Sequence, residues 1–93
     1  MAESSREKPL IQKNKSRKSK NSHVLLLLND DVNSFDYVIE SLMEVCDHTG
    51  IQAEQCAMIA HYKGKSEVKN GDFNTLKKMH TGLTRKGLNS IIE

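Results

Sequence analysis

Apolar and polar residues along residues 23–93 are arranged in a pattern that predicts six short elements. Residues 23–28 form a mostly aliphatic run, which indicates a strand that is buried on both faces or covered by helices. From residue 35 to residue 46 the apolar side chains recur at helical spacing, and Ser34 or Asn33 is placed to cap that helix. The pattern therefore begins with a strand followed by a helix.

A second helix is predicted to begin at residues 49–52, because Thr49-Gly50-Ile51-Gln52 fits the capping-box pattern. Small residues form one face of this helix and would let another element approach closely: Ala53, Cys56, Ala57 and Ala60. Gly64 is placed to end the helix. Residues 65–69 have partial strand character, and Asn70-Gly71 is a strong turn signal.

A third helix is predicted between Asp72, which is placed to cap it, and Gly87, which ends it. Residues 88–92 then indicate a short final strand. The predicted order is strand, helix, helix, strand, helix, strand. The economical way to bury these apolar faces is an α+β domain, with helices packed on a face of one small antiparallel three-stranded sheet.

Charge separates the first 22 residues from the rest of the chain. Residues 1–22 carry seven Lys/Arg against two Glu, a net charge of about +5, and Leu10 and Ile11 are their only large aliphatic residues. Residues 23–93 carry seven Lys/Arg against ten Asp/Glu, about −3. A segment with so little apolar surface cannot offset the entropy of ordering, so we expect a disordered basic extension before one folded domain.

The chain shows no signal for export or membrane insertion. No apolar run precedes a small-residue cleavage site, and the longest apolar stretch, residues 24–28, is far too short to span a bilayer. We therefore expect a cytoplasmic protein that does not bind membranes. In a reducing compartment, Cys46 and Cys56 are expected to act as small apolar core residues.

Motifs for catalysis and nucleotide binding are incomplete. Gly64-Lys65-Ser66 resembles the end of a P-loop, but Ile59 occupies the position of the required first glycine. Asp30 and Asp31 are adjacent, and neighbours in an extended chain point to opposite sides, so Asp31 is expected to point away from any group that Asp30 binds. Since no nucleophile motif is present either, we expect no enzyme activity and no cofactor.

Two other classes of site have partial support. Cys46, His48, Cys56 and His61 are numerous enough for zinc, but their spacing does not match the paired loops of structural zinc sites. The basic residues 1–22 suggest a nucleic-acid or ribosome-associated protein as the alternative function. That segment has no aromatic residue for base stacking, and the folded part is acidic, so nucleic-acid binding is the weaker hypothesis.

The polar corner after the first strand has the chemistry of an amine-binding site. An α-amino group is a compact cation that needs hydrogen-bond acceptors. Asn29 offers an amide oxygen, Asp30 a carboxylate, and His61, at the end of the second helix, a neutral ring nitrogen. Apolar side chains beside the corner come from both helices: Val38, Ala57 and Ala60. The sequence thus predicts a polar mouth above an apolar pocket.

Three segments together resemble the ClpS family, adaptors of the bacterial N-degron (N-end rule) pathway. They are Leu25-Leu26-Leu27-Leu28-Asn29-Asp30-Asp31, then Phe35-Asp36-Tyr37-Val38-Ile39-Glu40, then Ala53-Glu54-Gln55 leading to Ala60-His61-Tyr62-Lys63-Gly64-Lys65. The resemblance covers about residues 23–93. It implies a three-stranded antiparallel sheet with three helices, preceded by a flexible N-terminal extension that the family uses when it engages the unfoldase.

What the resemblance implies for function is recognition of proteins that begin with Leu, Phe, Tyr or Trp. A monomeric adaptor would deliver these clients to a Clp-type AAA+ unfoldase, ClpA-like or related, and its protease. By matching position, the residues that would hold the α-amino group are Asn29, Asp30 and His61. Those that would line or gate the side-chain pocket are Asn33, Phe35, Val38, Ala57, Ala60 and Leu88.

The chain departs from the family pattern around this pocket. Asn33 replaces a Thr, Phe35 replaces a Met that acts as the gate, and Ala57 replaces a further pocket Met. A bulkier gate and a smaller wall would reshape the pocket, so the family's ranking of client residues does not carry over. The segment after Lys65 is several residues shorter, which leaves the register of Leu88 open.

Overall fold

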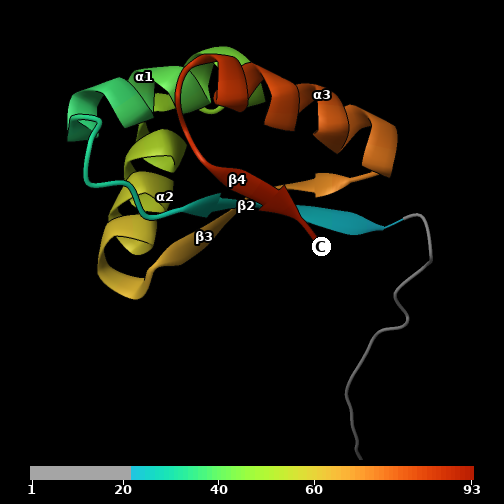
Figure 1. Cartoon of the computed structure of the whole chain (residues 1–93), viewed down its shortest axis with the longest axis horizontal. Coiled ribbons are helices and arrows are strands. Elements are labelled where there is room, and N and C mark those ends of the chain that lie inside the picture. Colours follow the sequence, from blue (N-terminus) through green and yellow to red (C-terminus); the bar gives the residue numbers. More distant parts are fainter. Residues whose placement is uncertain (1–21) are drawn as a thin grey trace, which may run out of the picture.

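The computed structural model describes residues 22–93, so the extension expected at residues 1–22 lies outside the described residues except for Ser22. The elements follow the predicted order (Figure 1). They are β2 (His23–Leu28), α1 (Phe35–Cys46), α2 (Gly50–Lys63), β3 (Lys65–Gly71), α3 (Phe73–Arg85) and β4 (Ser90–Ile92). None of the helices within residues 22–93 is long and apolar enough to cross a membrane.

The three strands form one antiparallel sheet in the order β3-β2-β4, which confirms the predicted α+β fold. The aliphatic strand β2 is central, and Leu26 is paired with Glu67 on one side and Ile91 on the other. The pairing with β3 passes from Leu25↔Lys69 to Leu26↔Glu67, so β3 carries one extra residue, Val68, at a bulge.

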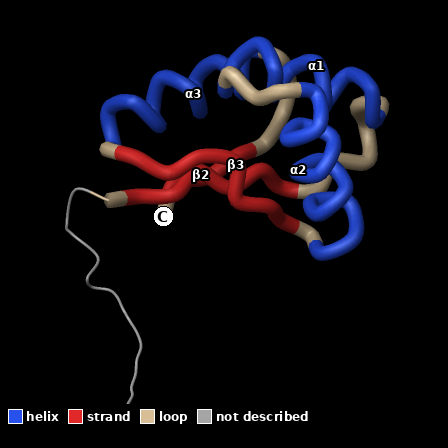
Figure 2. The backbone as a smooth tube through the Cα atoms, turned by 180° about the vertical axis from the view of Figure 1, so that it is seen from behind, coloured by secondary structure: helices blue, strands red, loops and turns tan. Residues whose placement is uncertain are grey.

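The core lies between the sheet and the helices. Leu25 and Leu27 point from β2 into it and are almost fully buried, together with Leu42 of α1 and Leu76 and Leu83 of α3. Helices α2 and α3 contact the sheet, while α1 packs mainly against these two helices. Figure 2 shows the same arrangement from behind, with α1 and α3 running along one side of the sheet.

Local hydrogen bonds explain where the helices begin. Ser34, rather than Asn33, caps α1, since its Oγ accepts from the Tyr37 N–H at 3.1 Å. At the start of α2 both bonds of the predicted capping box form: the Gln52 N–H donates to Thr49 Oγ1 at 3.1 Å, and the Thr49 N–H donates to Gln52 Oε1 at 2.9 Å. The capping residues therefore fix the helix starts that the sequence predicts.

The prediction of a turn at Asn70-Gly71 is wrong. Both residues belong to β3, where Asn70 pairs with Val24 and Gly71 with His23. Pairing with the central strand overrides the local turn preference, and the chain turns only at Asp72, which caps α3 through the Thr75 N–H at 3.1 Å. Strand β3 is therefore two residues longer than predicted.

The last strand is shorter than predicted, because Leu88 lies in the turn after α3 rather than in β4. The Leu88 N–H donates to the Leu83 carbonyl at 2.9 Å, and the Gly87 N–H donates to the Thr84 carbonyl at 2.9 Å. Gly87 has a φ of 82°, the left-handed conformation that suits glycine after a helix. These bonds turn Leu88 inward, where only 2% of its surface is exposed.

Candidate functional site

A pocket of about 580 Å³ lies where β2 ends. Its walls come from the chain after β2, the first turn of α1, the second half of α2 and the turn that follows α3. All nine residues that the sequence singled out line it: Asn29, Asp30, Asn33, Phe35, Val38, Ala57, Ala60, His61 and Leu88. The structure thus brings together the residues expected for the amine and those expected for the side chain.

Helical spacing places the apolar part of the pocket. Phe35 and Val38 lie three residues apart on α1, and Ala57, Ala60 and His61 share one face of α2. Val38, Ala57 and Ala60 are buried, whereas Phe35, the first residue of α1, is 41% exposed. The small alanines leave room for the cavity, while Phe35 keeps an aromatic ring accessible at its edge.

Backbone pairing brings the polar part of the pocket to the end of α2. The Asn29 N–H donates to the Gly64 carbonyl at 2.9 Å, which joins the end of β2 to the cap of α2. His61 lies in the last turn of that helix. The carbonyl end of α2 therefore adds partial negative charge beside Asn29.

The Asp30 carboxylate organises the corner. Its Oδ1 accepts from the backbone N–H groups of Val32 at 2.7 Å and Asn33 at 3.2 Å. Its Oδ2 accepts a short hydrogen bond from the Asn33 side-chain amide. That side-chain bond is the main reason that the pKa of Asp30 is lowered. Burial opposes it, and the two backbone bonds add smaller lowering effects. A carboxylate offers about four lone-pair sites, so Asp30 retains capacity for a further donor.

Asp31 also lines the pocket, although the sequence predicted that it would point away. The prediction assumed extended chain, but the bonds from Val32 and Asn33 to Asp30 fold residues 30–33 into a turn. Alternation of side chains does not hold in a turn, so the reason for placing Asp31 on the opposite side does not apply here.

Met58 and Tyr62 are two further lining residues that sequence reasoning missed. Each directly follows a predicted residue of α2, Ala57 and His61, and they lie four positions apart on neighbouring turns. Both are exposed at the surface. Both positions follow from the helical periodicity of α2 if the side of the helix that faces the pocket is extended by one residue.

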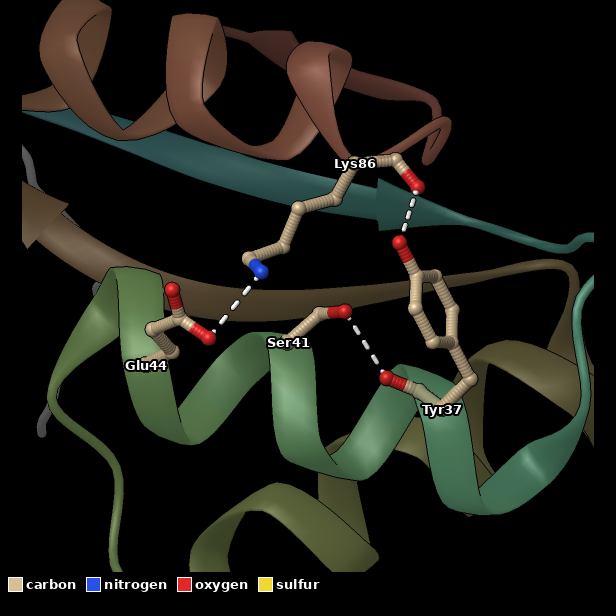
Figure 3. A network of polar contacts seen from close by, with 4 residues as sticks. All are labelled: Tyr37, Ser41, Glu44 and Lys86. Carbon is tan, nitrogen blue, oxygen red and sulfur yellow. Dashed lines mark hydrogen bonds and ion pairs between the residues drawn. The ribbon is translucent and has the colours of Figure 1, made fainter.

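The turn that carries Leu88 is held against α1 (Figure 3). The Tyr37 hydroxyl donates to the Lys86 carbonyl at 2.8 Å, and Lys86 Nζ forms an ion pair with Glu44 at 3.0 Å. The Ser41 hydroxyl donates to the Tyr37 carbonyl at 2.8 Å. The hydrogen bond and charge of Glu44 raise the pKa of Lys86. This network joins one wall of the pocket to the helix that forms another.

Residues 22–93 hold no group of three or more His, Cys, Asp or Glu residues arranged to bind a metal ion. Cys46 is fully buried in the core, and burial raises its pKa to about 11. Cys56 is partly buried, and its pKa is also raised by burial. Raised pKa values disfavour the thiolate form that binds metals.

Comparisons with known proteins concern the family and the fold of the chain. Residues 18–90 match the family described as ATP-dependent Clp protease adaptor protein ClpS. Among solved structures, the chain is similar to Agrobacterium tumefaciens ClpS2 bound to L-phenylalaninamide, with a TM-score of 0.76 and 21% sequence identity. The similarity covers 81% of this chain and 98% of that one, and at this identity it shows the fold alone. No curated protein matches the sequence.

Proposed function

This chain belongs to the ClpS family of adaptor proteins, and from that premise we propose that it is a non-enzymatic adaptor for N-degron proteins. It binds the free α-amino group and the large hydrophobic first side chain of its clients, Leu, Phe, Tyr or Trp. It then delivers them to a Clp-type AAA+ unfoldase and its protease. One observation carries the proposal: a single pocket combines an acceptor-rich mouth with a buried apolar floor.

The amine is held by acceptors at the mouth. Asn29 supplies an amide oxygen, His61 a ring nitrogen, and Asp30 the remaining capacity of its carboxylate. Asp31 adds a second negative charge beside the same pocket. An N-terminal ammonium, with three donors and one positive charge, matches this set, whereas an acetylated N-terminus has lost the charge and two of the donors.

The first side chain enters the apolar floor. Val38, Ala57, Ala60 and Leu88 are all buried, and Phe35 flanks the entrance. The relative named above, ClpS2, is bound to L-phenylalaninamide. That ligand has a free α-amino group, an aromatic side chain and an uncharged carboxamide, and so resembles the first residue of a protein.

The energies suit a client that must later be released. Charge-assisted hydrogen bonds contribute roughly 1.5–3 kcal/mol each. Burying one Leu or Phe side chain adds about 1.5–3 kcal/mol. Association costs of about 4–15 kcal/mol oppose them. The surplus is modest, so binding is expected to be reversible.

A fluorescence-anisotropy titration tests the binding step. A labelled peptide with a free N-terminal Phe or Leu is expected to bind, and the same peptide with an acetylated N-terminus is not. His61→Ala and Asp31→Asn are expected to weaken binding without lowering the thermal unfolding temperature, since both side chains lie at the pocket mouth. Equal binding of the free and acetylated peptides would refute the proposal.

A reconstituted degradation assay tests the delivery step. A folded reporter that begins with Leu is degraded by a Clp unfoldase and its protease, with and without this chain. The chain is expected to accelerate degradation of the Leu reporter and not of one that begins with Met-Glu. We place this activity in the cytoplasm, with the adaptor acting as a monomer.

The alternative, a nucleic-acid or ribosome-associated protein, depends on the basic residues 1–22, which lie outside the described residues. It predicts that deleting residues 1–22 abolishes binding to RNA and that salt weakens binding steeply. The adaptor proposal predicts that the same deletion leaves peptide binding intact, so one truncated variant separates the two functions.

A further inference from the structure

The side-chain amide of Asn33 joins two parts of the site that are far apart in the sequence. Its Nδ2 donates to Asp30 Oδ2 and, at 3.0 Å, to the Gly87 carbonyl, 54 residues away. Both partners are hydrogen-bond acceptors, and they would repel the amide oxygen of Asn33 if the side-chain amide were turned by 180°. The orientation of the amide is therefore fixed. The two N–H groups of Asn33 are therefore both in use, and its oxygen is the only polar atom left.

The Gly87 end of this bridge is firmly held without Asn33. The Tyr37 hydroxyl holds the adjacent Lys86 carbonyl at 2.8 Å (Figure 3), and the Gly87 N–H donates to the Thr84 carbonyl at 2.9 Å. The next residue, Leu88, is anchored by its bond to Leu83 and by burial. The turn after α3 is thus a fixed support for Asn33.

The Asp30 end has less support of its own. It lies in a turn between β2 and α1, and the contacts that hold its carboxylate come from Val32 and Asn33 within that turn. The bond from Asn33 to Gly87 is the side-chain contact that ties this turn to a distant part of the molecule. Asn29 keeps its backbone bond to Gly64 at one end of the corner, so removing the Asn33 bond would loosen the turn around Asp30 rather than detach the whole corner.

We propose that Asn33 is a positioning residue for amine recognition: its amide clamps the Asp30 corner to the turn after α3, and it acts on the client through that corner. This inference rests on the proposed function and revises one detail of it, since the family resemblance places Asn33 among the residues that line or gate the side-chain pocket. The pocket wall formed by Leu88 stays in place without Asn33, because Tyr37 and Leu83 hold that turn.

The two roles predict different patterns of affinity. A positioning residue acts on the α-amino group, which every client has, so Asn33→Ala should weaken peptides that begin with Leu, Phe, Tyr or Trp by the same factor. Loss of one charge-assisted hydrogen bond to the amine corresponds to a weakening of about 10- to 150-fold. A wall residue would instead change the ranking of the four peptides.

Asn33→Asp distinguishes positioning from direct contact with the amine. This nearly isosteric variant keeps an acceptor oxygen and adds a negative charge, so it should bind an ammonium at least as well if Asn33 touches the amine itself. It loses both donors and faces the acceptors Asp30 and Gly87, so the clamp predicts binding at least as weak as that of Asn33→Ala.

Tyr37→Phe is the matched control, since it removes a tether of the same turn but no partner of Asp30. The pKa of the Asp30 carboxyl, followed by NMR, should rise in Asn33→Ala and stay unchanged in Tyr37→Phe. Asp31, His61 and Tyr62 are the other titratable groups that line the pocket, so all three are followed in the same titration. Thermal unfolding of the full chain checks that each variant is folded.

The proposal is overturned if Asn33→Ala binds all four peptides as the wild type does, or if its loss of affinity depends on the first residue of the peptide. It is also overturned if Asn33→Asp binds as tightly as the wild type. Failure of the proposed function looks different. In that case the wild-type chain itself would not distinguish free from acetylated peptides, whatever residue stands at position 33.

Discussion

Helices α1 and α3 approach one another closely at Gly82. A Cβ added to Gly82 would lie 2.9 Å from Val45 Cγ1 of α1, which is closer than side-chain carbons normally come. Val45 packs against the core and is β-branched, so it has few other rotamers available. We therefore expect Gly82→Ala to force the two helices apart or to push Val45 out of its place.

The magnitude comes from two opposing terms. Replacing glycine by alanine inside a helix stabilises it by about 0.8–1 kcal/mol. Inserting a methyl group into a filled space costs about 1–3 kcal/mol. We therefore expect Gly82→Ala to lower the free energy of unfolding by about 1 kcal/mol. In a Val45→Ala background the clash disappears, and the same substitution should raise the free energy of unfolding by up to about 1 kcal/mol.

Urea denaturation followed by circular dichroism measures all four chains of this double-mutant cycle. Gly50→Ala, at the first position of α2, is the control for a methyl group added to open space, because no atom lies within 4 Å of a Cβ added there. The critical result is that Gly82→Ala lowers the free energy of unfolding in the wild type and raises it in the Val45→Ala variant. If Gly82→Ala stabilises the wild type as much as it stabilises the Val45→Ala variant, the reasoning about close helix contact is wrong.

Three further predictions concern separate parts of the molecule. Thr49→Ala removes the hydroxyl of the capping box and should lower the free energy of unfolding by about 1 kcal/mol in urea denaturation, and an unchanged midpoint would contradict the capping role. Cys46 has a pKa of about 11, so at pH 8 roughly one thiol in a thousand is ionised, and mass spectrometry after brief treatment with iodoacetamide should find Cys56 labelled first. Labelling of both at equal rates would show that the core opens readily. Ala57→Met should fill part of the pocket floor and weaken binding of a Trp peptide more than that of a Leu peptide, which anisotropy would detect as a changed ratio.

The fold was predictable because its signals are local. The capping box and the other caps act between residues three positions apart, and Ser34, Thr49 and Asp72 all begin helices as predicted. The Asn70-Gly71 pair shows where local signals fail, since its turn preference yields to pairing with β2. Strand length depends on a partner far along the chain, and the sequence of β3 alone does not contain that partner.

The candidate site also has one part that the sequence predicts and one part that it does not. Its apolar floor follows from helical spacing on α1 and α2, so Val38, Ala57 and Ala60 were identified without the structure. The polar contacts were not, because the bond from Asn33 to Gly87 spans 54 residues and depends on how the turn after α3 docks.

The corner at Asp30 shows why this division matters for function. Sequence reasoning treated residues 29–31 as extended chain and assigned the amine to Asp30 alone among the carboxylates. The structure folds that chain into a turn around Asp30 and leaves Asp31 beside the pocket. A carboxylate that must both hold a turn and bind a cation shares its lone pairs between the two tasks, while its neighbour has more of them to offer. Comparing Asp30→Asn with Asp31→Asn therefore separates the two tasks: the first should weaken peptide binding and loosen the turn, and the second should weaken peptide binding alone.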